Sequence, residues 1–362
     1  MNALLEPARL GDLTLKNRIV MAPMTRARAG ASRIPNDVMA EYYSQRASAG
    51  FILTEATAVS PQGIGYADTP GIWSREQVEG WKKTTDAVHL KGGLIFLQLW
   101  HVGRISDPVF LNGELPVAPS AIAPKGTVSH IQPEKPFVVP RALDRSEIPI
   151  VIEAFRKGAR NARLAGFDGV EIHGANGYLP DQFLQSSTNR RADDYGGPIE
   201  NRAKFLLQVV DAAVSAWGPD RVGVHLSPRA DAHDMGDDDL KRTFGYVARE
   251  LGRRKIAFIF LRDAQGEGYL TPYLKEQFGG TVVANQQLTP ELAEALVRER
   301  KADLAAFGTL YISNPDLVER IGAGGPFNDT NPSTIYAEGT TGYTDYPFLP
   351  QLHETKQPQD KT

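Results

Sequence analysis

The segment from Glu171 to Leu179, EIHGANGYL, carries the side chains best suited to chemistry. His173 and Asn176 can both donate hydrogen bonds, and Tyr178 carries a weakly acidic phenol. Two convergent donors suit an oxygen atom that gains negative charge during a reaction. A nearby phenol suits delivery of a proton to a neighbouring carbon. This pattern predicts a site that reduces a C=C bond beside a carbonyl, provided that another group supplies hydride.

Composition narrows the class of protein. The chain has 362 residues, is 41% hydrophobic and 23% charged, and carries a net charge of −3, so it offers no basic surface for nucleic acid or an anionic membrane. It contains no cysteine, which excludes disulfides, thiolate nucleophiles and cysteine-bound metal centres. No histidine or carboxylate spacing predicts a metal site. With no basic leader and no apolar run of about 18 residues, we expect a cytoplasmic enzyme.

Short apolar runs alternate with amphipathic helical stretches along the whole chain. The apolar runs are typical of strands buried on both faces, and they cover residues 18–24, 51–59, 94–100, 169–173, 221–227, 256–262, 281–285 and 304–309. Helices are expected over residues 35–48, 74–91, 146–164, 199–217, 238–252, 289–300 and 314–321. Strict alternation indicates parallel pairing, and eight strand–helix units predict a closed (β/α)8 TIM barrel of the α/β class rather than an open sheet.

Three further segments complete the expected organisation. The proline-rich stretch 101–145 after the third strand is long enough for a loop that caps the barrel mouth. Residues 4–16 are expected to plug the opposite end, and the polar tail 351–362 is expected to be frayed. We expect residues 1–362 to form a single domain.

Several ordered motifs resemble one family. They read KNRIVMAPMTR from Lys16, TEA from Thr54, QLWHVGR from Gln98, HGANGY from His173, RRADDYGG from Arg190, NPDL from Asn314 and GYTDYP from Gly342. On these motifs the chain resembles the Old Yellow Enzyme family of FMN-dependent ene-reductases, which includes bacterial N-ethylmaleimide reductases. The resemblance covers almost all of residues 4–350.

The resemblance implies a function and a set of roles. FMN would lie across the barrel mouth, be reduced by NAD(P)H and pass hydride from its N5 to an activated alkene in a ping-pong cycle. The substrate's carbonyl oxygen would be held by His173 and Asn176, and Tyr178 would donate the proton. FMN would contact Pro23, Met24, Thr25, Ala56 and Gln98, and the substrate pocket would be shaped by Tyr66, Trp100 and Tyr336. The substrates would be unsaturated carbonyl compounds, and the protein would be a monomer or homodimer.

The sequence departs from the family pattern where the cofactor's charged and polar ends would bind. His225 and Thr309 stand where the family has arginines, and Asn285 with Gln286 stands where the family has small, glycine-rich residues. We expect His225 to donate to the flavin edge and Arg262 to be a relocated cation. The backbone around Asn285, Gln286, Gly308 and Thr309 would hold the phosphate.

Other functions and roles were weighed on the same residues. The missing arginines favour, as the alternative, a flavin-poor or non-catalytic ligand-binding barrel of the same fold. A dienoyl-CoA reductase-like barrel would need cysteines for its iron–sulfur cluster, and an aldolase-like barrel would need a lysine at a strand end; the chain offers neither. Glu171 is expected to be structural. The charges around Arg191 and the Asp193–Asp194 pair are expected to form a salt-bridged loop.

Overall fold

A closed parallel barrel organises the molecule. The computed structural model describes residues 2–129, 133–229 and 232–349. In this part of the chain, eight strands pair in the order β4-β3-β13-β12-β11-β10-β9-β6, and pairing of β4 with β6 closes the ring. The barrel strands are β3 (Ile19–Met21), β4 (Phe51–Leu53), β6 (Ile95–Trp100), β9 (Gly169–Gly174), β10 (Val222–Leu226), β11 (Phe258–Arg262), β12 (Thr281–Asn285) and β13 (Leu304–Phe307). The predicted (β/α)8 barrel and its eight strand positions are confirmed.

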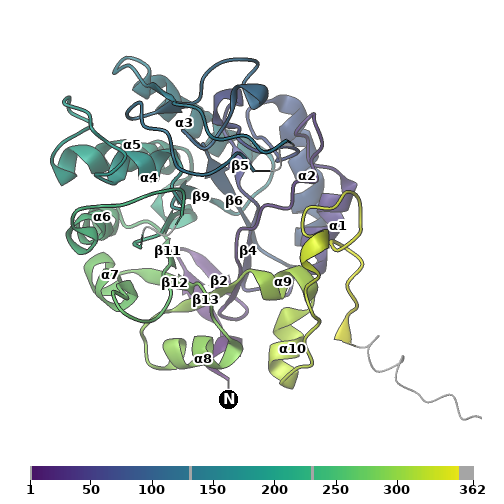
Figure 1. Cartoon of the computed structure of the whole chain (residues 1–362). Coiled ribbons are helices and arrows are strands. Elements are labelled where there is room, and N and C mark those ends of the chain that lie inside the picture. Colours follow the sequence, from purple (N-terminus) through teal and green to yellow (C-terminus); the bar gives the residue numbers. More distant parts are fainter. Residues whose placement is uncertain (1, 130–132, 230–231, 350–362) are drawn as a thin grey trace, which may run out of the picture.

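Helices surround the barrel (Figure 1). The predicted helices correspond to α1 (Asp37–Gln45), α2 (Arg75–Leu90), α3 (Ile148–Leu164), α5 (Ile199–Trp217), α6 (Leu240–Arg253), α8 (Pro290–Arg298) and α10 (Leu317–Ala323). Three helices were not predicted: α4 (Leu179–Leu184), α7 (Thr271–Phe278) and α9 (Thr309–Ser313). For α7 the local signals were present, because Pro272 lies in its first turn and Gly279 follows its last residue in a left-handed conformation. No helix among the described residues is both long enough and apolar enough to cross a membrane.

Large and small residues alternate inside the barrel. The rings of Phe51, Phe96 and Phe258 meet there at centroid distances of 5.3–5.9 Å. Glycine leaves room for two of these rings, since a Cβ on Gly169 would lie 2.2 Å from Phe96 and one on Gly223 would lie 2.2 Å from Phe258. The barrel is therefore a packed core, and a ligand can enter only at its mouth.

A hairpin covers the amino-terminal end of the barrel. Strands β1 (Ala8–Leu10) and β2 (Leu13–Leu15) pair antiparallel. Leu10 and Leu15 are fully buried against the interior cluster of the barrel that includes Phe51. Asp12 forms an ion pair with Arg221, which immediately precedes β10. The predicted plug is confirmed, and it leaves the opposite end of the barrel available for function.

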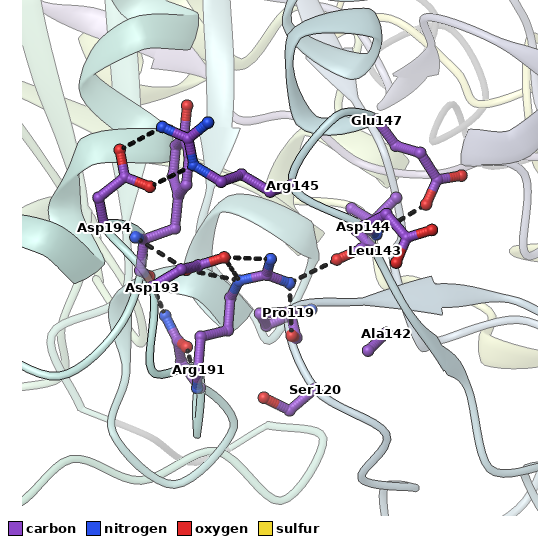
Figure 2. A network of polar contacts seen from close by, with 12 residues as sticks. Pro119, Ser120, Ala142, Leu143, Asp144, Arg145, Glu147, Arg191, Asp193 and Asp194 are labelled. Atoms are coloured by element: carbon purple, nitrogen blue, oxygen red, sulfur yellow. Dashed lines mark hydrogen bonds and ion pairs between the residues drawn. The ribbon is translucent and has the colours of Figure 1, made fainter.

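The long segment after β6 is held in place by charged side chains. It contains the short strands β7 (Val117–Ala118) and β8 (Arg141–Ala142), which pair with each other. Figure 2 shows Arg191 bonded to Asp193 and to the carbonyl oxygens of Pro119 and Leu143, at 3.0 and 2.6 Å. Arg145 pairs with Asp194 beside it. The predicted salt-bridged loop is present, and it ties the capping segment to the chain that follows α4.

The C-terminal segment returns to the barrel mouth through buried Arg26. The guanidinium of Arg26 donates to the carbonyl oxygens of Ile335 (3.2 Å) and Gly342 (2.6 Å). The ring of Tyr343 stacks on Tyr42 of α1 at 3.9 Å. These contacts fix the segment that carries Tyr336. The predicted tail 351–362 lies outside the described residues, and the assignment of the whole chain to one domain stays a prediction.

Replacing Gly11 by alanine tests the fit of the plug. Gly11 has φ +55°, and a Cβ there would lie 2.1 Å from the backbone oxygen of Asp220. We expect Gly11→Ala to lower the free energy of unfolding by roughly 2–4 kcal/mol, because backbone strain and a steric clash add. Denaturant unfolding measures the change.

Gly30→Ala is the matched control, because Gly30 has φ +67° but nothing within 4 Å of the added methyl. It should lose only about 1–2 kcal/mol. An equal loss of unfolding free energy in the two variants would show that Gly11 is not packed against the backbone of Asp220 as described.

Candidate active site

Strand register brings the predicted residues to one end of the barrel. Parallel pairing aligns Gln98 with Glu171, and His173 with His225. Arg262, the last residue of β11, is aligned with Asn285, the last of β12. The carboxyl end of a parallel barrel is where its functional loops lie. The sequence-predicted site is therefore assembled from separate strands at the open mouth.

A cavity of about 650 Å³ lies at this mouth. Of the predicted residues, its lining includes Pro23, Met24, Thr25, Asn176, His225, Arg262, Asn285, Gln286, Gly308, Thr309 and Tyr336. Its apolar lining, which the sequence did not single out, includes Ala22, Phe260, Leu288, Ala306, Phe307, Leu310, Ile312 and Ile335. The other predicted residues are outside this lining: Ala56, Tyr66, Gln98, Trp100, His173 and Tyr178. Gln98 and His173 contact the lining residue His225 directly, and Tyr178 reaches the cavity through His173.

Gln98 links two buried groups beneath the cavity. Its Nε2 donates to Glu171 Oε2 at 2.6 Å and lies 3.2 Å from His225 Nδ1. An amide nitrogen can only donate, so His225 Nδ1 accepts and the ring proton is on Nε2. That Nε2 is buried and has no hydrogen-bond partner among the described residues. His225 thus offers one N–H donor to an acceptor in the cavity.

The site is built from neutral groups. Burial, reinforced by the charge of Arg262, lowers the pKa of His173 to about 3. Burial, together with His173 and Arg262, holds the pKa of His225 well below its ordinary value. The two imidazoles stack at 5.1 Å with nearly parallel rings. Burial also raises the pKa of the Glu171 carboxyl to about 8, against the opposing hydrogen bond from Gln98. At neutral pH both rings are uncharged and Glu171 is mostly protonated.

Arg262 crosses from one side of the cavity to the other. Its Nη1 donates to Asn176 Oδ1 at 2.8 Å, and its Nε donates to Gln286 Oε1 at 3.0 Å. Asn176 has φ +58°, which asparagine tolerates better than most residues. Because Arg262 engages Oδ1, the Nδ2 end of Asn176 is the end that can donate to a ligand.

Aromatic side chains form a wall beside the cavity. The ring of Tyr178 meets His173 edge-on at 4.8 Å and Trp100 at 5.0 Å. Tyr66 stacks on Trp100 at 5.4 Å, and its hydroxyl lies 3.0 Å from that of Tyr178. Burial raises the pKa of Tyr178 well above its ordinary value and that of Tyr66 to about 12. Both phenols are therefore protonated at neutral pH. Ala56 belongs to the same apolar cluster as Trp100.

Two residues that support Asn176 were missed in the sequence. His233 Nδ1 lies 2.6 Å from the backbone oxygen of Asn176, and Ser227 Oγ accepts from its backbone nitrogen at 2.9 Å. Both follow β10, far from the HGANGY motif along the chain. No local spacing could have connected them with it. The polar residues that follow β10 were the only available signal.

Glu171 predicts a pH dependence of stability. A carboxyl whose pKa is raised in the fold keeps a proton that the unfolded chain loses, so its contribution is lost as pH rises from about 4 to about 8. Glu171→Gln does not titrate and keeps the acceptor for Gln98. We expect the stability of the variant relative to the native chain to rise by about 1 kcal/mol per pH unit between pH 5 and 8.

Urea unfolding at several pH values measures this difference. The same substitution at the exposed Glu114 should leave the pH profile of the native chain unchanged. A constant difference between Glu171→Gln and the native chain across this range would mean that Glu171 is ionised in the fold.

Comparison with known proteins places these features in a family. Residues 3–328 match the model of the NADH:flavin oxidoreductase / NADH oxidase family. The chain is 41% identical to a probable flavin mononucleotide-dependent alkene reductase of Leishmania infantum, covering 96% of this chain and 98% of the relative. It is 43% identical to 12-oxophytodienoate reductase 1 of Oryza sativa subsp. japonica, covering 97% and 94%.

Solved structures agree with these matches. An old yellow enzyme homologue from Zymomonas mobilis superposes with a TM-score of 0.93 at 43% identity, covering 96% of this chain and 100% of that one. Morphinone reductase in complex with tetrahydroNAD superposes with a TM-score of 0.92 at 44% identity, covering 97% and 98%. The chain therefore belongs to the Old Yellow Enzyme family of flavin oxidoreductases.

Proposed function

We propose that this protein is an FMN-dependent ene-reductase that reduces the activated C=C bond of α,β-unsaturated carbonyl compounds at the expense of NAD(P)H. The observation that carries the proposal is the grouping of His173, Asn176 and Tyr178 at the barrel mouth, with the His173 and Tyr178 rings 4.8 Å apart. Enones, enals and maleimides are the expected substrates, as for an N-ethylmaleimide reductase.

The mouth fits FMN in shape and in donor chemistry. Pro23, Met24 and Thr25 line one part of the cavity, and the loops after β12 and β13 line another. The buried Nε2 of His225 supplies a donor that has no protein partner among the described residues. Arg262 adds a positive charge to the lining. When bound, FMN supplies the hydride that it receives from NAD(P)H. Gln98 would orient the imidazole of His225 toward the flavin through its contact with Nδ1. Thr309 and Gln286 lie in the loops that are proposed to hold the phosphate of FMN.

His173 and Asn176 are proposed to hold the substrate's carbonyl oxygen. As hydride reaches the β-carbon, that oxygen becomes negatively charged, and fixed donors stabilise it by roughly 3–4 kcal/mol each in oxyanion holes. His173 stays neutral, so it donates one N–H without first having to lose or gain a proton. The contact with Arg262 keeps Asn176 Nδ2 as a donor. The pair thus matches the charge that develops.

Tyr178 is proposed to complete the reaction by protonating the α-carbon. Its pKa is raised by burial, so the phenol is fully protonated at neutral pH and the proton is available at its Oη. The edge-on contact with His173 keeps that phenol beside the carbonyl-binding pair. Hydride and proton therefore add to adjacent carbons of a substrate held by its oxygen.

A second candidate is a ligand-binding barrel of the same fold without flavin turnover. It is favoured by one observation: Arg262 bonds side chains on two loops of the cavity, Asn176 and Gln286. A cofactor entering the mouth has to fit around these contacts or replace them. His225 and Thr309 stand where the family has arginines, and neither replaces the missing positive charge.

Titration of the apoprotein with FMN separates the two candidates. We expect one FMN per chain and, for Arg262→Met, about tenfold weaker binding because a charged hydrogen-bond donor is lost. Arg253→Met, on the exposed face of α6, is the control and should bind as the native chain does. A protein that carries no yellow colour once the excess FMN has been removed would support the ligand-binding barrel.

Replacing Tyr178 by phenylalanine tests the proton donor. We expect Tyr178→Phe to slow reoxidation of the reduced flavin by 2-cyclohexenone by 100-fold or more, because general acid catalysis contributes about that much. Reduction of the flavin by NADPH should keep its native rate. Stopped-flow absorbance measures both half-reactions, and an equal loss in both would contradict the assigned role.

A further inference from the structure

Tyr178 has a second phenol behind it. Its hydroxyl lies 3.0 Å from that of Tyr66, and either atom can be the donor. Tyr66 is fixed by stacking on Trp100 at 5.4 Å, so its hydroxyl is held toward Tyr178. Around the Tyr178 ring, His173, Trp100 and His233 lie at centroid distances of 4.8, 5.0 and 5.4 Å. Among the described residues, Tyr178 thus has one hydroxyl partner and several close ring neighbours.

The capping segment supplies the next hydroxyl. The Ser129 side chain lies close enough to the Tyr66 hydroxyl to lower the pKa of Tyr66. Val128, which precedes it, is buried, and its backbone nitrogen donates to Lys135 O at 2.8 Å. The backbone nitrogen of Phe137 donates to Gly126 O at 3.4 Å, and its side chain packs against the apolar cluster that contains Trp100. Ser129, a half-buried residue next to Val128, therefore belongs to the part of the capping segment that is held near Tyr66.

We propose that Tyr66 and Ser129 form a proton relay that replaces the proton of Tyr178 while it is being given to the substrate. This inference rests on the proposed function. Tyr178 Oη gives its proton to the substrate's α-carbon, where a C–H bond forms. In the same step Tyr178 Oη takes the proton of Tyr66 Oη, and Tyr66 takes one from water by way of the hydroxyl of Ser129, which leaves hydroxide in the solvent. One proton enters for each one consumed, and the relay needs no redox partner.

Burial raises the pKa of both phenols, so each is protonated before the reaction. As Tyr178 gives up its proton, its oxygen becomes a strong base 3.0 Å from the Tyr66 hydroxyl and can take the proton of Tyr66. Hydroxyl hydrogens rotate freely, so the hydrogen bond can reverse its direction.

The relay also explains how the Tyr178 hydroxyl regains its proton while the product is still bound. Tyr178 is half-buried. In the proposed reaction its hydroxyl lies beside the substrate's α-carbon, so a bound product hinders its direct contact with water. Transfer through Tyr66 allows the proton to return before the product leaves.

Tyr66→Phe tests the relay because it removes only a hydroxyl and keeps the ring that stacks on Trp100. With FMN-loaded, NADPH-reduced protein, we expect alkene-dependent reoxidation to slow tenfold or more, while the Kd of 2-cyclohexenone and the rate of flavin reduction stay within twofold. In mixtures of H2O and D2O the native rate should depend on more than one exchangeable proton, and the Tyr66→Phe rate on one. Ser129→Ala should slow reoxidation about threefold, in the same direction.

Tyr246→Phe, in α6, is the matched control and should behave as the native chain in all of these measurements. If Tyr66→Phe reoxidises at the native rate with an unchanged isotope dependence, or only binds the alkene more weakly, Tyr66 merely shapes the pocket and the relay is wrong. If the native protein itself is not reoxidised by the alkene, the proposed function fails and the relay fails with it.

Discussion

Closure of the parallel barrel is the constraint on which the rest of the structure depends. Each strand carries few polar residues, and no single strand holds a complete site. Closing the ring through β4 and β6 forces all eight carboxyl ends to one mouth and fixes their relative heights. Gln98 then lies level with Glu171, and His173 with His225. The plug and the Phe51 cluster fill the rest of the barrel, so chemistry is confined to that mouth.

Neutral polar groups are buried beneath the barrel mouth. Glu171, His173 and His225 are all buried, and burial favours the uncharged form of each. Donors that are already fixed in place stabilise a nearby oxygen as it becomes negative, because they do not have to reorganise during the reaction. Arg262 brings charge close to this neutral set and influences both imidazoles. Its bonds to Asn176 and Gln286 couple the Asn176 side-chain amide to the loop after β12.

Much of the fold could be predicted, because it depends on local patterns. Continuous apolar runs marked all eight barrel strands, and capping residues such as Ser74 marked the longer helices. The short helices α4 and α9 were not predicted because five or six residues carry too little periodicity, whereas α7 was missed although Pro272 and Gly279 marked its ends. Tertiary packing, rather than propensity, decides such helices.

The site was predictable only in part, for a similar reason. The spacing of His173, Asn176 and Tyr178 within one motif singled out the proposed catalytic group, and the family pattern pointed to much of the cavity lining. Partners contributed by other loops could not be foreseen: Ser227 and His233 beneath Asn176, and the contact of Arg262 with Asn176. Tyr66 was expected as a pocket residue, but its hydroxyl contact with Tyr178 depends on how β6 and the preceding loops pack.

The proposed reaction requires the substrate's carbonyl oxygen to lie between His173 and Asn176 at the barrel mouth while it becomes negatively charged. A crystal structure of the FMN-loaded protein with a bound phenolate, which resembles an enolate in shape and charge, tests this most directly. We expect the phenolate oxygen to lie about 2.7–3.1 Å from a ring nitrogen of His173 and from Asn176 Nδ2. A phenolate oxygen bound elsewhere, with that pair still engaged only by protein groups, would contradict it.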